Sequence, residues 1–320
     1  MKKILLASTV LAMTATVAAA EVTLSGDARM GIIDNFGSGD NVAFTSRARV
    51  RFTLSGETDG GLTFGASFRA HQAAGAANGT NGSVFISGAF GKLSMGDVDG
   101  AALAATGHVN GVGLTGLGDL NELTYLGNGG ADTDGGGVDD TSDPSALYEY
   151  SAGDLAVYLS VTNPAGISNV ASEEVVAYAI GVAYTFGDYK VSAGYEMTDG
   201  SEGPADVRKQ KHFILGGDAT FGAVTLQARY GKFSGSSGGV GISADQYSIA
   251  ATYTMDALSA TVFYADNEET TLELLPRGGR KAYGIGASYD LGGGAKVVGG
   301  YVKNKTDDEH AFDLGVSMSF

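Results

Sequence analysis

The sequence of 320 residues has no cysteine, no tryptophan and only four prolines. Without cysteine there are no disulfide bonds, no thiolate metal ligands and no cysteine nucleophile. Long apolar runs are also missing, because after Ala20 no segment approaches the roughly eighteen consecutive apolar residues of a membrane helix. If the chain lies in a membrane, it must cross it as a closed β-barrel.

Basic residues are scarce as well. There are 20 lysines and arginines against 36 aspartates and glutamates, which gives a net charge of −16. A chain this acidic does not present the basic surface that nucleic acids require, so nucleic acid is excluded as a partner. The charge favours divalent cations or cationic solutes.

The first twenty residues have the pattern of a secretory signal peptide. Lys2 and Lys3 precede a short apolar run, and small residues follow as far as Ala20. The run is too short for a transmembrane anchor. We expect Sec-type export, cleavage after Ala20 and a single barrel domain over residues 21–320, whose charge would be −18 once both lysines are removed.

The segment 41–55, NVAFTSRARVRFTLS, alternates between two kinds of side chain. Apolar residues such as Phe44, Val50 and Leu54 share one face, and Arg47, Arg49 and Arg51 share the other. Three arginines on one face cannot pack into an ordinary protein core. The strand fits a membrane wall with a water-filled interior, and it also fits the exposed face of a soluble β-sandwich.

The rest of the chain favours the membrane wall, because alternating segments recur with short turns and long polar loops in turn. We predict sixteen strands, at 22–32, 41–55, 62–72, 83–89, 92–97, 146–151, 155–162, 175–185, 189–196, 212–220, 224–231, 246–254, 258–265, 281–289, 296–302 and 310–320. Eleven tyrosines lie on the apolar phase, as in an aromatic girdle, although strands favour tyrosine in any case. An even count of this size predicts an antiparallel transmembrane barrel with an aqueous channel.

The last eleven residues, HAFDLGVSMSF, alternate without interruption and end on Phe320. This C-terminal strand, together with the opening EVTLSGDARMG at 21–31, resembles the general diffusion porins of the Gram-negative outer membrane, in their alphaproteobacterial branch. The resemblance implies a homotrimer of barrels, with the short strands 83–89 and 92–97 at its axis. It also implies that the two chain ends meet in one strand, with Glu21 beside Phe320.

The longest loop, residues 98–145, is far longer than ordinary connections. The resemblance implies that this third loop folds into the barrel and narrows it. Its candidate acidic residues are Asp119 and Glu122, and the candidate basic wall facing them consists of Arg29, Arg47, Arg49, Arg51 and Arg69. Opposite charges across a narrow waist would select solutes by size and polarity. The alternative is a set of solvated wall charges far from any waist.

The second part of this loop, GNGGADTDGGGVDDTSD, carries a cluster of carboxylates that suits hard cations. Its members are Asp132, Asp134, Asp139, Asp140 and Asp143. Their spacing only half fits an EF-hand, so a weak Ca²⁺ or Mg²⁺ site and a simply solvated acidic loop both remain open. Acidic loops of this kind could also let divalent cations bridge the surface to lipopolysaccharide.

We therefore expect a passive outer-membrane channel for small hydrophilic solutes and ions, which needs no cofactor and is not an enzyme. The sign of its ion selectivity stays open, because the net charge favours cations while the arginines favour anions. Two other functions also remain open. One is a barrel hydrolase, although the four histidines are scattered. The other is a structural or adhesive barrel without an open pore, for which about eight strands would suffice.

Overall fold

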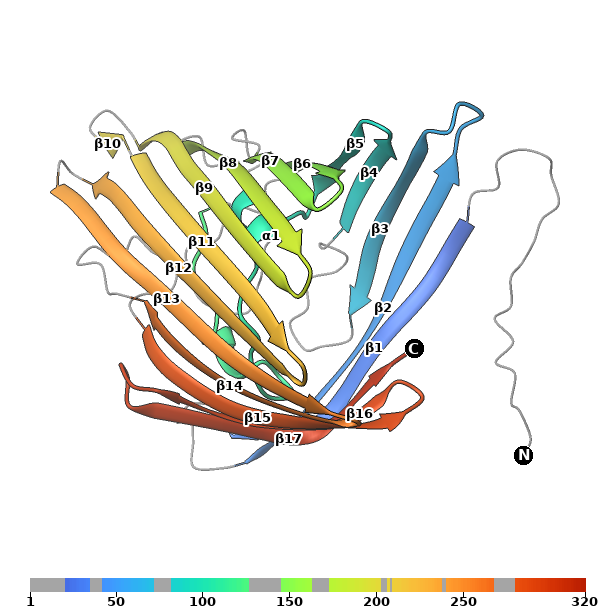
Figure 1. The fold of residues 1–320 in the computed structure, drawn as a ribbon, viewed down its shortest axis with the longest axis vertical. Helices are drawn as coiled ribbons and strands as arrows, with labels where there is room; N and C mark the ends of the chain where they lie inside the picture. Colours follow the sequence, from blue (N-terminus) through green and yellow to red (C-terminus); the bar gives the residue numbers. More distant parts are fainter. Residues whose placement is uncertain are drawn as a thin grey trace.

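The computed structural model is a closed antiparallel barrel of sixteen strands (Figure 1). It describes residues 21–34, 42–71, 82–126, 145–162, 173–202, 206–207, 209–237, 240–267 and 280–320. The barrel strands are β1 Glu21–Asp34, β2 Ala43–Glu57, β3 Thr63–His71, β4 Gly82–Gly88, β5 Gly91–Gly96, β6 Ser145–Ala152, β7 Leu155–Thr162, β8 Glu173–Phe186, β9 Tyr189–Glu202, β11 Lys209–Phe221, β12 Val224–Ser237, β13 Val240–Met255, β14 Leu258–Asn267, β15 Arg280–Gly292, β16 Ala295–Asn304 and β17 Glu309–Ser319. The two-residue strand β10, Asp206–Val207, pairs only with the end of β9.

Each strand pairs with its neighbours in the sequence, and β1 pairs with both β2 and β17. This closure leaves no free sheet edge. The predicted fold class is therefore confirmed. Among the described residues, no helix is long and apolar enough to cross a membrane.

The alternation of side chains sets the two faces of the wall. Val22, Leu24 and Phe44 are exposed on the outside, Phe44 at 93%. Nine of the predicted girdle tyrosines are exposed in the same way, at Tyr178, Tyr184, Tyr189, Tyr195, Tyr247, Tyr253, Tyr264, Tyr283 and Tyr289. An apolar outer face flanked by aromatic residues suits lipid.

Short turns, most of them of two residues, join the strands at one end of the barrel. In the turns at 187–188 and 222–223, the first residue is a glycine with φ near +60°. Such backbone costs glycine little and costs other residues more. These turns match the short connections expected between the predicted strands 175–185 and 189–196 and between 212–220 and 224–231.

Two details of the sequence prediction were wrong. Residues 197–211 and 232–245 were expected to be loops, but β9 continues to Glu202, β11 begins at Lys209, and β12 and β13 together occupy most of 232–245. The apolar alternation fades there because lipid covers only about 25 Å of the wall's height. The backbone ladder does not need lipid, so it continues into the polar ends.

The chain ends also meet differently from the expectation. Phe320 exchanges two backbone hydrogen bonds with Gly26, of 2.9 and 3.1 Å, so the two ends lie in neighbouring strands. Glu21 lies five residues further along β1, opposite Ser55 of β2, or roughly 17 Å beyond Gly26. The register of the β1–β17 pair closes the barrel.

Candidate pore constriction

Five arginines line one inner wall of the barrel, on the adjacent strands β1, β2 and β3. We call them the arginine ladder: Arg29, Arg47, Arg49, Arg51 and Arg69. The strand register places Arg29 opposite Arg47 and Arg51 opposite Arg69. All five lie on the inward phase because each strand continues the alternation that puts Val50 and Leu54 outside.

Like charges placed directly opposite each other repel, and one carboxylate relieves part of this repulsion. Asp27 lies opposite Arg49, and its Oδ1 is 2.9 Å from the Arg47 guanidinium and 3.7 Å from Arg49 Nε. The side chains of Arg47 and Arg49 are 23% and 18% exposed, so both still reach water. The ladder thus keeps a strong positive charge on the inner wall.

The third loop runs inside the barrel, where α1, Ala101–Thr106, lies within the ring of strands (Figure 1). Inward-facing glycines of the wall admit it. A Cβ at Gly181 of β8 would overlap the carbonyl oxygen of Ala101, and one at Gly194 of β9 would press on Ala102. These positions need glycine because the loop backbone lies directly against the wall.

Apolar contacts hold the rest of the loop. Val109, Val112 and Leu117 are buried against Phe263 and Val302 of the wall, in one cluster. Leu103, Leu123 and Tyr125 form a second cluster with Ile214. The described part of the loop therefore partly fills the interior of the barrel on the side formed by β7–β17.

Polar side chains of the wall also fix the loop. Asp313 of β17, 3% exposed, accepts hydrogen bonds from the Leu114 and Thr115 amides and from the Thr115 hydroxyl, at 2.7 to 2.9 Å. Glu196 of β9 is fully buried and accepts from the Leu126 amide and from His212 Nδ1 at 2.6 and 2.8 Å. Further wall anchors are Ser160, Gln227, Arg229, Gln246, Ser248 and Asn267.

The ladder touches this fixed loop at one point. Arg29 donates to the carbonyl oxygen of Leu114 at 3.4 Å, next to the residues that Asp313 holds. The basic wall and the loop are therefore in direct contact across β1 and β17. This contact places the ladder at the level of the loop in the barrel.

The two candidate loop carboxylates lie inside the barrel. Asp119 ends the short helix η1, Leu117–Asp119, which packs on β16 and β17. Glu122 lies next to β14, where its carbonyl oxygen accepts from Asn267, and its carboxylate is 3.6 Å from His108 Nε2. Asp119 is thus nearer the ladder strands around the wall than Glu122 is.

Sequence reasoning missed one more carboxylate in this loop, Asp99, which precedes α1. Burial raises the pKa of the Asp99 carboxyl, and the charge of Glu149 raises it further. Its signal in the sequence was only its place at the start of the long loop. Glu149 in turn pairs with Lys92 at 3.0 Å across β5 and β6.

The carboxylates of the candidate cation site lie outside the described residues: Asp132, Asp134, Asp139, Asp140 and Asp143. Within the described part of the chain, no group of three or more histidines and carboxylates could hold a metal ion. The signal peptide, residues 1–20, also lies outside the described residues.

A sequence profile described as Gram-negative porin matches residues 7–309. The chain belongs to the Gram-negative porin family. A porin of Rhodobacter capsulatus is 38% identical over 321 residues, which cover 94% of this chain and 100% of that protein. A porin of Fuscovulum blasticum is 26% identical over 319 residues, with the same coverage.

Solved structures give the same result. A porin structure refined at 1.8 Å resolution superposes on this porin with a TM-score of 0.77 at 34% identity, and the match covers 94% of this chain and all of that one. A triple mutant of Rhodopseudomonas blastica porin reaches 0.70 at 22% identity and supports the fold alone. This porin is a diffusion channel of the outer membrane.

Proposed function

We propose that this porin selects small hydrophilic solutes and ions at a waist between the arginine ladder and the third loop. The observation that carries the proposal is the direct contact of the ladder with the loop, through Arg29 and Leu114. A fixed loop opposite a positive wall sets both a size limit and a transverse field. The passage is passive and needs no cofactor and no catalytic residue.

Single-channel recording in a planar bilayer tests this selection. We expect large open steps, and a reversal potential under a salt gradient that moves towards cations when Arg47, Arg49 and Arg51 are changed together to alanine. The matched control changes Lys211, Lys232 and Lys303 to alanine, which removes three positive charges from the outer face. If both triple variants shift the potential equally, the ladder does not set selectivity.

Absence of conductance from folded, inserted protein would contradict the channel. It would leave the barrel hydrolase or the adhesive barrel as the function to assay. The recording also decides the sign of selectivity, because the acidic loops favour cations and the ladder favours anions.

We infer that three copies assemble around β4 and β5, the two shortest strands of the barrel itself. Val84 and Met95 on these strands are 56% and 50% exposed on the outer face. Because the chain has no cysteine, Val84→Cys gives a clean test. Oxidation should cross-link copies through this position but not through Ile249→Cys on the far wall, and equal cross-linking at both sites would contradict the arrangement.

We propose Sec-type export with cleavage after Ala20, which N-terminal sequencing of the mature protein checks.

We also propose that divalent cations at the acidic loops bridge the surface to lipopolysaccharide. The support for this is the carboxylate cluster in the sequence at 132–143. Chelation with EDTA should then loosen trimer association, and unchanged association would contradict the bridge.

A further inference from the structure

One pair of residues in the arginine ladder differs from the rest. The strand register places Arg51 of β2 directly opposite Arg69 of β3, so two guanidinium groups extend from neighbouring backbones that are about 5 Å apart. Among the described residues, neither guanidinium has a carboxylate partner or a hydrogen-bond acceptor. Arg51 is exposed and Arg69 is half-buried, so both side chains still reach water.

The other three arginines already have partners. Arg47 and Arg49 lie 2.9 and 3.7 Å from the same oxygen of Asp27, and Arg29 donates to the carbonyl oxygen of Leu114. The positive charge that no described carboxylate balances is therefore concentrated on the remaining pair.

This pair lies on the periplasmic side of the contact between the ladder and the loop. Arg51 follows Arg47, the register partner of Arg29, by four residues along β2, or roughly 13 Å, in the direction of the short turn at 58–62. Short turns of such barrels face the periplasm. A solute that enters from outside therefore meets the pair after it has passed the loop contact.

Hydroxyl groups lie beside the pair. Ser25 of β1 is directly opposite Arg51. Two residues further towards the periplasm, the register aligns Thr23, Thr53 and Ser67 in one row across β1, β2 and β3. These side chains share the inward phase of Arg51, because strand positions two residues apart face the same side. The wall there offers hydrogen-bonding groups that carry no charge.

Two neighbouring guanidinium groups suit a tetrahedral dianion better than a carboxylate. Each guanidinium can donate two parallel hydrogen bonds to two oxygens of its ligand. A carboxylate has two oxygens and is satisfied by one guanidinium, whereas a phosphate monoester presents three terminal oxygens that two guanidinium groups can share. Its charge of up to −2 also balances both arginines.

We propose that Arg51 and Arg69 form a binding site for phosphate monoesters on the periplasmic side of the waist. The phosphate lies between the two guanidinium groups, and the polar organic part of the ester lies over the row of Thr23, Thr53 and Ser67. This site rests on the channel function and adds to it a class of solute that the channel retains during passage.

Block of the single-channel current tests the site, with the intact porin in a planar bilayer in potassium chloride at pH 8. Inorganic phosphate and glycerol 3-phosphate are added separately, and succinate is the control probe, because it has the same charge on two planar carboxylates. We expect both phosphate probes to reduce the current with a saturating concentration dependence, and succinate to require about tenfold more for half-block. Block by inorganic phosphate without block by glycerol 3-phosphate would overturn the assignment to esters.

The variant Arg69→Lys separates the shape of the guanidinium from its charge. The charge is kept, so the reversal potential under a salt gradient should not move. The concentration of glycerol 3-phosphate for half-block should rise about tenfold, because a lysine cannot donate two parallel hydrogen bonds. An unchanged half-block concentration would contradict recognition by the guanidinium.

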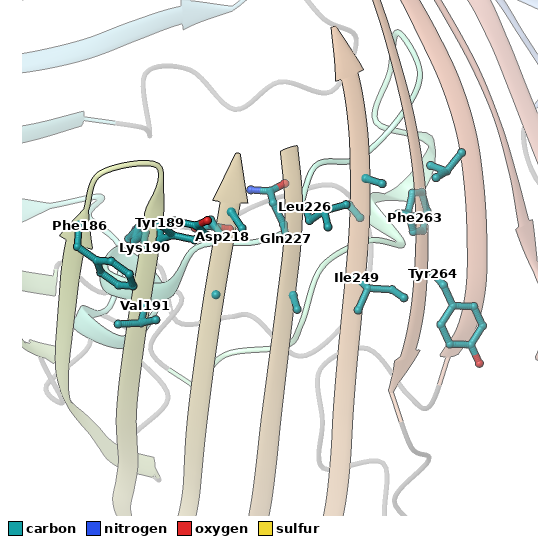
Figure 2. Close-up of a pocket in the computed structure, with 16 residues that line it drawn as sticks. Phe186, Tyr189, Lys190, Val191, Asp218, Leu226, Gln227, Ile249, Phe263 and Tyr264 are labelled. Atoms are coloured by element: carbon teal, nitrogen blue, oxygen red, sulfur yellow. The ribbon is translucent and has the colours of Figure 1, made fainter. Parts of the chain in front are cut away.

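A second pair of variants controls for charge alone. Arg51→Met removes one positive charge from the site and should also weaken the block about tenfold. Lys190→Met removes one from β9, six strands from β3 around the wall (Figure 2). Lys190 is on the inward phase because Tyr189 and Val191 on either side of it are exposed on the outside. Equal weakening by both variants would assign the block to the general field of the lumen and overturn the site.

The open conductance without added phosphate reports on the channel itself. A porin that conducts in potassium chloride but is not blocked by the phosphate probes, or is blocked as strongly by succinate, would overturn the site and leave the channel function in place. Absence of conductance from folded, inserted protein would contradict the channel function, and the site with it.

Discussion

Single carboxylates fix the third loop at the residue scale. Asp313 accepts three hydrogen bonds from Leu114 and Thr115. In sequence it is one polar residue in the alternation of the last strand, and nothing marks it as different from Ser317 or Ser319. Only the closure of β17 on β1 brings it to the loop, so sequence reasoning could place it inside the barrel but not assign its partners.

We predict that Asp313→Ala loosens the loop. Each buried donor left without its acceptor costs roughly 1–3 kcal/mol. The loop should then move in the lumen, which single-channel recording would show as frequent fluctuations of the open current. Asp313→Asn retains one acceptor oxygen and should have a smaller effect, while a quiet channel in Asp313→Ala would contradict the anchoring role.

A second prediction at this scale concerns pH. The pKa of the Asp99 carboxyl is raised above its ordinary value of 3.8, mainly by burial and then by Glu149. The folded protein therefore holds this proton more tightly than the unfolded chain does, so stability from this group is present at low pH and is lost as pH rises through the raised pKa. The side chain still reaches water, so the effect is small.

Asp99→Asn removes this loss, because an amide does not ionise. The variant should unfold at a higher temperature than the parent at pH 7 and at about the same temperature at pH 3, below the ordinary pKa of 3.8. Melting followed by circular dichroism at both values checks this. An equal difference at both pH values would mean that the substitution acts through packing and not through charge.

Strands were the most predictable part of the molecule at the element scale. Residues 155–162 were predicted as a strand with those bounds, because lipid outside and water inside impose a strict alternation. The polar ends of β9, β12 and β13 were missed because no lipid covers them. The path of the loop was also beyond the sequence, since it depends on which wall glycines lie opposite Ala101 and Ala102.

Close packing of α1 on the wall leads to a third prediction. Gly181→Ala places a Cβ against the Ala101 backbone and the Ala105 methyl group. The helix must shift towards the lumen, which should cost roughly 1–3 kcal/mol and change the open-channel current. Gly217→Ala is the control, because a Cβ there meets nothing within 4 Å. Equal unfolding midpoints for both variants would contradict this account of the wall glycines.

Charge is separated at the scale of the whole molecule. The acidic excess gives the chain −16, whereas the ladder concentrates five positive charges on three neighbouring strands inside. Composition alone could not reveal this separation, because net charge does not show on which side of the barrel wall a charge lies. The alternation in 41–55 could reveal it, since it fixes which side each arginine faces.

Closure of the barrel is also a property of the whole molecule, and it depends on the last residue. Phe320 exchanges both backbone hydrogen bonds with Gly26, while its side chain is 79% exposed on the outside. Deleting Phe320 removes both bonds, at about 1 kcal/mol each, and also a lipid-facing ring. We predict a lower yield of folded barrel after refolding into detergent, measured by the faster migration of the folded form in unheated gels.

Phe320→Ala separates the two contributions, because it keeps the backbone bonds and removes only the ring. If the backbone hydrogen bonds to Gly26 stabilise the pairing of β1 with β17, this variant should refold nearly as well as the parent in detergent, where no assembly machinery acts. A loss as large as that of the deletion would instead assign the defect to the aromatic ring. Closure of the barrel between β1 and β17 would then depend on the lipid-facing side chain of Phe320 and not on its backbone hydrogen bonds.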